Sequence, residues 1–199
     1  MTPCRELAPA EIPLAIDRVR SFAREHSIRP GIQVSPTSLH ADLQGELDRQ
    51  GWGIQWPTLV LTGPACLQAP SAPALTVADH ATPAWLRAWA LCEPGRDVSA
   101  HARTVFELLR GRAAFARIGA EAVGILVETD GLAGMFCLAV DTSRRREGLG
   151  TALVRGLLSR AQARLAYLQV GEGNHAARGL YGRLGFAEAY RYSHRTLGN

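Results

Sequence analysis

The segment from Val140 to Gly150 constrains the fold of this chain more than any other stretch, because it joins two different periodicities through a short turn. An apolar run, Leu132 to Val140, precedes the turn and is typical of a buried strand. After the turn, apolar or small residues recur at the spacing of one helical face: Leu149, Ala152, Leu153, Gly156, Leu157 and Ala161. The sequence therefore predicts a strand, an arginine-rich turn with two glycines, and a helix. Such a turn directs backbone N–H groups and a helix N-terminus toward one point, which favours binding of an anion, most often a phosphate.

Two common phosphate-binding loops do not fit this turn. A Walker loop ends in Gly-Lys-Ser or Gly-Lys-Thr, and the chain contains no lysine, since all 22 of its basic residues are arginines. A dinucleotide-binding turn needs a third glycine, where this sequence has Leu153, and an acidic residue about 20 residues further on. The next predicted strand, Ala166 to Val170, leads to no suitable acid.

A third pattern, Arg-x-x-Gly-x-Gly, is filled by Arg145, Gly148 and Gly150. It resembles the acetyl-CoA signature of the GCN5-related N-acetyltransferase (GNAT) family. In that family the amides of the turn hold the pyrophosphate of the cofactor, and the glycines let the backbone come close to it. An ordinary glycine-containing turn between a strand and a helix is the alternative explanation of this motif taken alone.

A second segment resembles the other signature of the same family, the helix that follows the fifth strand. The matching residues are Asn174, Ala177, Leu180, Tyr181 and the closing Leu184-Gly185-Phe186. One helix and one strand separate the two segments, which is the usual order in the family. The resemblance extends over about residues 74–195, and its motifs lie from about residue 131 onward.

The resemblance implies an α/β fold with a mixed, mainly antiparallel sheet flanked by helices, and a smaller N-terminal α/β part. It implies an N-acetyltransferase that moves an acetyl group from acetyl-CoA, as co-substrate, to a primary amine by direct transfer in a ternary complex, without a metal. The expected partner is a small-molecule or peptide amine, with no nucleic acid and no membrane, and the expected state is a monomer or homodimer. A non-catalytic CoA-binding or regulatory module with the same fold is the competing hypothesis.

The resemblance also assigns residues to the cofactor. The turn and the start of the helix would hold the pyrophosphate through Arg145, Arg146, Glu147, Gly148, Leu149, Gly150 and Thr151. The pantetheine arm would lie along the fourth strand of the domain, at Leu138, Ala139 and Val140. This strand and the fifth are expected to splay apart and admit the thioester. Asn174 and Ala177 would contact the arm from the second signature, although Asn174 suits a helix N-cap equally well.

Tyr181 is the candidate general acid, because the family's tyrosine at this position can give a proton to the departing thiolate. The alternative is that Tyr181 only packs against the cofactor or the core. No general base is evident in the proposed fourth strand. Glu128, Glu172 and His175 lie near its flanks or near the fifth strand, and any of them could act through water.

Bulk composition fits a soluble globular protein, with 199 residues, 47% of them hydrophobic and 20% charged. No apolar run reaches the length of a membrane span, and the N-terminus lacks the apolar core of a signal peptide, so we expect a cytoplasmic protein. The four cysteines are scattered and lack metal-ligand spacing. The net charge of +4 is dense only at Arg144–Arg146, which the phosphate turn explains, so nucleic-acid binding is disfavoured. The absence of lysine indicates GC-rich codon use and a bacterial source.

Two parts are expected, residues 1–68 and 69–199, with a linker at 63–73 that is rich in glycine and proline. Near the end of the first part, Gly51-Trp52 repeats the glycine and aromatic residue of Gly185-Phe186. The repeat indicates either a degenerate second copy of the family's fold or two helices with the common glycine C-cap.

The start of the second part is predicted to contain helices at 83–91 and 100–110. An antiparallel meander of three strands should follow, at 113–118, 122–127 and 131–140. Large apolar residues of the first helix either line an acceptor pocket or belong to the core: Trp85, Leu86 and Trp89.

Overall fold

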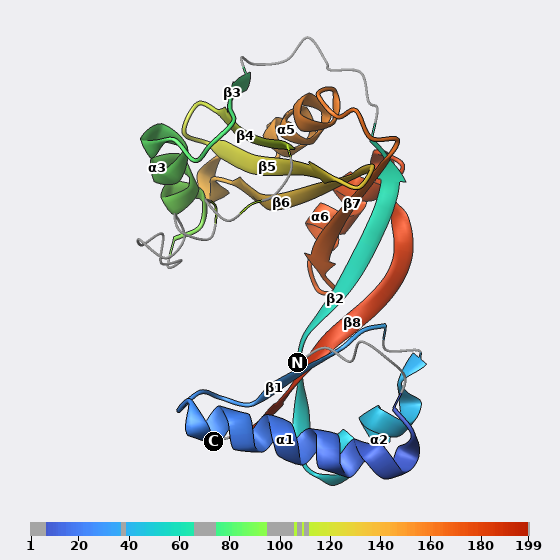
Figure 1. Ribbon diagram of the computed structural model, residues 1–199. Coiled ribbons are helices and arrows are strands. Elements are labelled where there is room, and N and C mark those ends of the chain that lie inside the picture. The colour runs from blue at the N-terminus through green and yellow to red at the C-terminus, as the bar shows by residue number, and fades with distance from the viewer. Residues whose placement is uncertain are drawn as a thin grey trace. The chain divides into compact units, whose positions relative to one another are not determined.

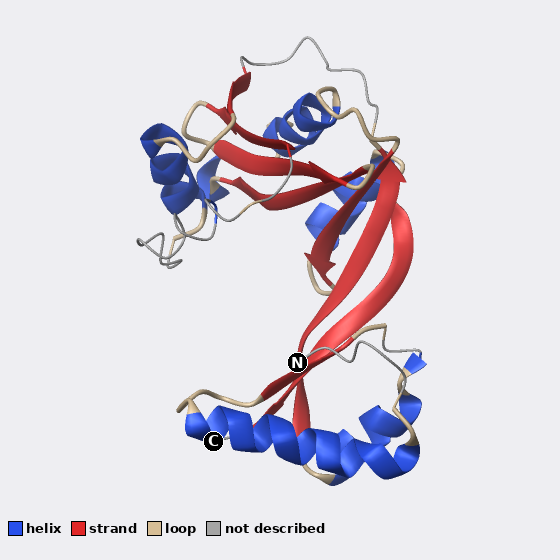
Figure 2. Cartoon of the chain, viewed as in Figure 1, coloured by secondary structure: helices blue, strands red, loops and turns tan. Residues whose placement is uncertain are grey.

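The computed structural model describes residues 7–36, 39–65, 75–94, 106, 109 and 112–198 (Figure 1). Helices and strands are interspersed along the chain (Figure 2). The helices are α1 (Ile12–Glu25), α2 (Ala41–Arg49), α3 (Pro83–Cys92), α5 (Leu149–Leu158) and α6 (His175–Arg183), with 3₁₀ turns η1 (Pro9–Glu11) and η3 (Thr142–Arg144). The strands are β1 (Gly31–Val34), β2 (Trp52–Pro64), β3 (Leu75–Ala78), β4 (Arg112–Ile118), β5 (Ala122–Thr129), β6 (Leu132–Val140), β7 (Leu165–Gly171) and β8 (Ala187–Leu197).

The strands form one sheet in the order β1-β8-β2-β7-β6-β5-β4-β3. The pairs β1–β8, β3–β4, β4–β5 and β5–β6 are antiparallel, whereas β6 and β7 run parallel. Parallel neighbours need a crossover, and α5 supplies it between β6 and β7. This confirms the predicted α/β fold class, with a mixed, mainly antiparallel sheet and flanking helices.

The meander predicted after α3 is confirmed as β4, β5 and β6. Its second hairpin turns at Asp130 and Gly131, whose φ values of 50° and 77° suit a two-residue turn between twisted strands. The helix predicted at 100–110 lies outside the described residues except for positions 106 and 109. The linker predicted at 63–73 lies outside the described residues from residue 66 onward. Residues 63–64 continue β2 instead.

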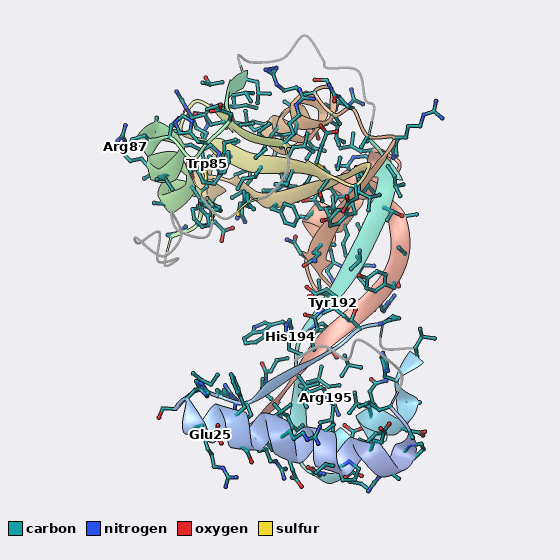
Figure 3. The ribbon with its side chains drawn as sticks, in the orientation of Figure 1. Glu25, Trp85, Arg87, Tyr192, His194 and Arg195 are labelled. Carbon is teal, nitrogen blue, oxygen red and sulfur yellow. The ribbon has the colours of Figure 1, made fainter. Side chains whose placement is uncertain are left out.

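Helix α3 covers one face of the meander and forms a core with it. It begins at Thr82, whose hydroxyl oxygen accepts a hydrogen bond from the backbone N–H of Trp85 (3.1 Å). The Trp85 indole N–H donates to the backbone oxygen of Ala116 (2.9 Å), so this buried polar group is satisfied (Figure 3). Trp85, Leu86 and Trp89 are all buried with β5 side chains, which confirms the core alternative for these three residues.

The chain packs into two compact units, and neither is a continuous stretch. The first contains the chain up to Leu61, Val170–His175 and everything from Glu188 onward; the second contains Thr62–Gln169 and Ala176–Ala187. β8 belongs to the first unit because it pairs with β1, from Gly31 opposite Thr196 to Val34 opposite Ser193. The single division at residues 68 and 69 stays a prediction of the sequence.

The first unit has its own core, to which α1, β1, α2 and β2 contribute: Ile12, Ile16, Val19, Ile32, Val34, Leu43, Leu47 and Trp52. Arg195 of β8 is also buried in this unit, with 1% of its surface exposed. Its guanidinium forms an ion pair with Asp48 of α2 and donates to the backbone oxygen of Gln44 (3.4 Å; Figure 3). A buried cation of this kind needs its acceptor, since an unpaired charge away from water is strongly unfavourable.

We expect Asp48→Asn to lower the free energy of unfolding by about 1–2 kcal/mol, because Arg195 keeps its burial and loses a charged acceptor. The loss is moderated because the Asp48 side chain is 65% exposed. Urea unfolding measures the change, and Asp42→Asn, an exposed position on the same helix, is the matched control. Equal stability of the two variants would contradict the assignment of Asp48 as the partner that holds Arg195.

Candidate functional site

The turn between β6 and α5 is held by its own hydrogen bonds and contains two left-handed backbone positions. After β6 ends at Val140, the Asp141 carboxylate accepts hydrogen bonds from the backbone N–H of Ser143 (2.8 Å) and from its hydroxyl (2.9 Å). These bonds, the backbone one first, lower the pKa of Asp141, so the carboxylate stays charged. Arg146 and Gly148 then adopt φ values of 72° and 82°, and α5 begins.

The first turn of α5 presents its backbone N–H groups without a side-chain cap. Gly148 is the N-cap residue and has no side chain to accept a hydrogen bond. Its carbonyl accepts from the N–H of Ala152 (3.0 Å), and helix geometry leaves the N–H groups of residues 149–151 without an intrahelical acceptor. Residues 142–148 are exposed to solvent. This end of α5 is therefore suited to an anionic ligand.

The three consecutive arginines of the turn have different roles. Arg144 is bound by a fork of hydrogen bonds to the Glu147 carboxylate (2.8, 2.9 and 3.0 Å), and it lies 3.7 Å from a carboxylate oxygen of Glu121. The hydrogen bond from Arg144 also lowers the pKa of Glu147. Within the described part of the chain, Arg145 and Arg146 form no ion pair. Two of the three arginine charges are thus available to a ligand, and the Glu147 side chain is already occupied.

The two glycines of the motif are needed for different reasons. A Cβ added to Gly150 would lie 3.1 Å from Leu180 of α6 and 3.6 Å from Val140, so a side chain there would press against both. A Cβ added to Gly148 would meet no protein atom within 4 Å, but its φ of 82° is one that side chains disfavour. Gly150 therefore brings the start of α5 against α6 and the end of β6, and Gly148 sets the direction in which α5 leaves the turn.

The strands β6 and β7 separate before β6 reaches the turn. Their parallel pairing extends from their first residues to Met135 opposite Leu168, whereas β6 continues to Val140. The second part of β6 therefore has no β7 residue in register beside it, which is the divergence expected from the sequence. Ala139, in this part, is buried beneath α3.

A β-bulge lies in the same part of β6. The register between β5 and β6 shifts by one residue between Val123 and Ile125, and the extra residue is on β6. Cys137 takes a left-handed φ of 50° at this place. The Leu138 side chain packs over Gly124, where an added Cβ would approach it to 2.6 Å. Since the side chains of residues 138 and 139 face the protein, a ligand along this strand would meet backbone groups.

Tyr181 is a buried residue of α6, with 8% of its surface exposed. Its ring lies 6.2 Å from that of Phe186, at an angle of 60°, and its backbone oxygen accepts from the N–H groups of Leu184 and Phe186 (both 3.0 Å). Burial raises the pKa of the Tyr181 phenol to about 12, because the phenolate would lose its hydration. The hydroxyl therefore keeps its proton throughout the physiological range.

The other residues predicted from the second signature lie at or before the start of α6. Asn174 directly precedes the helix and donates its backbone N–H to the carbonyl of Gly171 (2.9 Å). Asn174 and His175 belong to the first compact unit, whereas Ala177 and Tyr181 belong to the second. His175 and Asn174 are exposed, and Ala177 is half-buried.

The two carboxylates considered as general bases have structural partners. One Glu128 oxygen accepts from the backbone N–H groups of residues 162–163 (2.6 and 2.8 Å), and the other lies 3.5 Å from Arg112. Glu128 is also paired with the first half of β6, opposite Ala133, away from the turn. Glu172 forms an ion pair with Arg191 (2.6 Å). These interactions argue for structural roles of both carboxylates.

The described residues contain no group of three or more histidine, cysteine, aspartate or glutamate side chains that could hold a metal ion. No helix among them is both long and apolar enough to cross a membrane.

A model described as the acetyltransferase (GNAT) family matches residues 78–186, a range that contains the turn, α5, β7 and α6. Among curated proteins, none matches the sequence. The fold is similar to that of a GCN5-related N-acetyltransferase from Kribbella flavida, at 23% identity and a TM-score of 0.74 over 99% of this chain and 79% of the other. A GCN5-related N-acetyltransferase from Sphaerobacter thermophilus is 20% identical, with a TM-score of 0.67 over 88% of this chain and 63% of that one. A tandem GNAT protein from the clavulanic acid biosynthesis pathway is 17% identical, with a TM-score of 0.66 over 98% and 71%.

The raised pKa of Tyr181 predicts a loss of stability at high pH. A phenol with a pKa near 10 when unfolded and about 12 when folded favours folding below pH 10 and loses that contribution as pH rises toward 12. Between pH 9 and 11, wild type should lose about 1.3 kcal/mol of unfolding free energy relative to Tyr181→Phe. Urea unfolding at both pH values measures this difference. Tyr190→Phe, at an exposed tyrosine, should instead follow wild type; a Tyr181→Phe curve parallel to wild type would show that the phenol is not desolvated.

Proposed function

The chain belongs to the acetyltransferase (GNAT) family, and from this premise we propose that it transfers an acetyl group from acetyl-CoA to a primary amine, directly and within a ternary complex. The observation that carries the proposal is the combination, in one compact unit, of an exposed turn that leads into an uncapped helix N-terminus with a tyrosine that keeps its proton. The first holds a phosphorylated donor, and the second supplies the proton that a leaving thiolate needs.

The residues of the turn fit the pyrophosphate of CoA. The N–H groups of residues 149–151 and the charges of Arg145 and Arg146 provide donors and positive charge at one exposed point. Glu147 contributes indirectly, because its carboxylate holds Arg144 and so supports the turn. When bound, acetyl-CoA supplies an activated thioester.

The second part of β6 fits the pantetheine arm. The arm is an extended chain with amide groups, and the backbone of Leu138, Ala139 and Val140 has no β7 residue in register beside it. Hydrogen bonds between the arm and this strand would extend the sheet locally, as an added strand does. The bulge at Cys137 redirects the backbone in this part of the strand. Asn174 and Ala177, at the start of α6, are the proposed contacts on the other side of the arm.

Tyr181 is the proposed general acid, and its Oη atom donates a proton to the departing sulfur. Burial has two opposite effects on this role. It keeps the hydroxyl protonated at every physiological pH, and it makes the phenol a weaker acid than a thiol. Donation is therefore expected to accompany cleavage of the carbon–sulfur bond rather than to precede it. The contact of Leu180 with Gly150 holds the adjoining turn of α6 against α5.

A non-catalytic CoA-binding module is the second candidate, and one observation favours it. Both carboxylates considered as general bases are held by ion pairs or backbone N–H groups. Catalysis would then depend on His175, the third candidate base, or on an amine that arrives deprotonated. A screen of primary amines for release of free CoA thiol separates the candidates, because a module binds CoA and releases no thiol with any amine.

We expect Gly148→Val to weaken CoA binding at least tenfold. Valine strongly disfavours a φ of 82°, so the amides of the turn would rotate away from the phosphate. Calorimetry with CoA measures the change. Gly131→Val is the matched control, since Gly131 also has a positive φ (77°) and open space at its Cβ, but lies in the hairpin between β5 and β6. Unchanged affinity in folded Gly148→Val would remove the turn from the proposed site.

We expect Tyr181→Phe to lower kcat about 10²-fold and to change acetyl-CoA affinity only a few-fold, because the ring remains and only the proton is lost. With the pKa near 12, the ratio of wild-type to variant kcat should stay constant from pH 7 to 10, since the phenol does not ionise there. Steady-state kinetics with single-turnover controls measures both quantities, and Tyr190→Phe serves as the control. A near-normal kcat while chemistry is rate-limiting would show that Tyr181 only packs.

A further inference from the structure

Two stretches of the chain contain the same elements in the same order. The first is α1, β1, α2 and β2; the second is α5, β7, α6 and β8. Gly51 follows α2 as Gly185 follows α6, and we call the separation of these two glycines along the chain the repeat interval. Adding the repeat interval to the residue numbers of α2, Ala41–Arg49, gives the bounds of α6, His175–Arg183. It likewise separates the first residue of β1 from the first residue of β7.

The ends of α2 and α6 are alike in detail. Gly51 and Gly185 have φ values of 76° and 86°, and each donates its N–H to the carbonyl three residues earlier (3.0 and 3.1 Å). The aromatic residues that follow, Trp52 and Phe186, are buried at 2% and 6% exposure. Glycine C-caps are common, so this likeness alone does not establish a repeat.

Burial extends the likeness through every element. Besides Trp52 and Phe186, seven pairs of positions one repeat interval apart are buried in both stretches, and their members in the first stretch are Val19, Ala23, Ile32, Val34, Leu47, Leu59 and Leu61. Their counterparts are Leu153, Leu157, Ala166, Leu168, Tyr181, Ser193 and Arg195. Helix and strand periodicities both agree without an insertion, which two unrelated glycine-capped helices would not produce.

The two stretches exchange their last strands. β1 of the first pairs with β8 of the second. β7 of the second is bonded to β2 of the first, through the N–H of Ala65 to the oxygen of Arg164 (3.1 Å) and the N–H of Glu172 to the oxygen of Pro57 (2.8 Å). If the stretches are interchanged, so that β1 replaces β7 and β2 replaces β8, the order β1-β8-β2-β7 becomes its own reverse. The arrangement of the four strands is therefore unchanged. This symmetry is expected of a duplication whose copies swapped strands.

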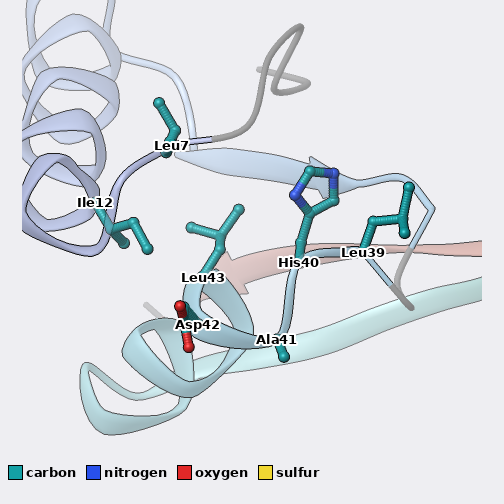
Figure 4. Close-up of a pocket in the computed structure, with 7 residues that line it drawn as sticks. All are labelled: Leu7, Ile12, Leu39, His40, Ala41, Asp42 and Leu43. Carbon is teal, nitrogen blue, oxygen red and sulfur yellow. The ribbon is translucent and has the colours of Figure 1, made fainter.

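We infer that residues 7–64 are a degenerate copy of residues 141–198, and that this copy binds a small amine with an apolar body where the other copy has its anion-binding turn. The binding place is a pocket of about 230 Å³ at the starts of α1 and α2 (Figure 4). Its apolar wall consists of Leu7, Ile12, Leu39 and Leu43, and its polar groups are His40 and Asp42.

The position of the pocket follows from the repeat interval. The apolar wall corresponds to Asp141, Arg146, Gly173 and Ala177 of the second copy. His40 corresponds to Asn174. The pocket thus occupies, in the first copy, the place of the turn and the start of α6 from which the cofactor site is proposed.

The first copy has lost the chemistry of that site. Glu11 and Ile12 occupy the positions of Arg145 and Arg146 of the second copy. Leu14 occupies the position of the left-handed Gly148. Pro13, in the first turn of α1, lacks an N–H group. Leu47 occupies the position of the tyrosine and has no proton to donate. The first copy therefore lacks the two arginines and the left-handed glycine proposed to recognise a pyrophosphate, so each chain should bind one CoA molecule.

The lining instead selects an apolar body with a positive charge. The Ile12 and Leu43 side chains point toward each other, and the His40 ring lies on the other side of Leu43 (Figure 4). Among the described residues of the lining, Asp42 in the first turn of α2 is the one with a formal charge, and its carboxylate attracts an ammonium group and repels anions. An imidazole nitrogen of His40 can accept a hydrogen bond from that group. The choice of an amine rests on this lining and not on the proposed acetyl transfer.

Calorimetry on the full chain tests the inference, with 2-phenylethylamine as probe and 2-phenylethanol and phenylacetate as its neutral and anionic analogues. The amine should bind best and phenylacetate least. Asp42→Asn should weaken the amine about three- to fivefold and leave the alcohol unchanged, since an exposed charge pair contributes modestly. Glu25→Gln, at an exposed acid of α1 outside the lining, is the matched control. Failure of all three probes to bind the folded protein would overturn the ligand assignment.

Two further variants place the binding in the pocket without relying on one substitution. Leu43→Trp should fill the pocket and abolish amine binding; Leu39→Arg, at a position 68% exposed, should weaken it without disturbing the fold. Gly148→Val should weaken CoA binding at least tenfold and leave amine binding unchanged. Amine binding that survives Leu43→Trp and Leu39→Arg but is lost in Gly148→Val would assign it to the second copy and overturn the inference. Two CoA molecules per chain would contradict the degenerate state of the first copy.

Discussion

The left-handed backbone at Arg146 and Gly148 is the constraint on which the proposed site depends. Such a conformation costs a residue with a side chain about 1–2 kcal/mol, and here the hydrogen bonds of Asp141 hold the start of the turn. The turn directs the first amides of α5 outward and brings Gly150 against Leu180 of α6. One local geometry therefore produces the proposed anion-binding end of α5 and also positions the helix that carries the proposed acid.

The duplication gives the same framework two different chemical outcomes. The copies share a set of buried positions, because much of a core is set by apolar periodicity, which tolerates many sequences. Anion binding is less tolerant, since it needs a left-handed glycine and positive charges that are not already paired. The first copy has Leu14 and Glu11 at those places and keeps only a pocket. The exchanged strands account for the retention of the first copy, because β8 with its buried Arg195 needs β1 and Asp48 beside it.

Much of this organisation was predictable from the sequence. The turn, α5, α6, the meander and the α/β class follow from local signals, and the similarity of Gly51-Trp52 to Gly185-Phe186 indicated a repeat as one of two explanations. The sequence left the role of Trp85 open, because an apolar residue on a helix suits a pocket and a core equally. Its indole hydrogen bond to Ala116, a residue of another element, decides for the core.

By itself, the sequence determined where an anion-binding turn can form, because glycine spacing, an arginine run and helical periodicity are properties of neighbouring residues; the tyrosine proposed to accompany the turn was indicated by the family resemblance. Only the tertiary structure decided which arginines are available. Arg144 is held by Glu147 and also lies near Glu121, which precedes β5 and is far from the turn in sequence. It also decided that Glu128 caps a loop and that β8 returns to β1. The contacts of Glu121, of Glu128 and of β8 join residues distant in the chain, and no local pattern encodes which of many possible partners a charge or a strand edge meets.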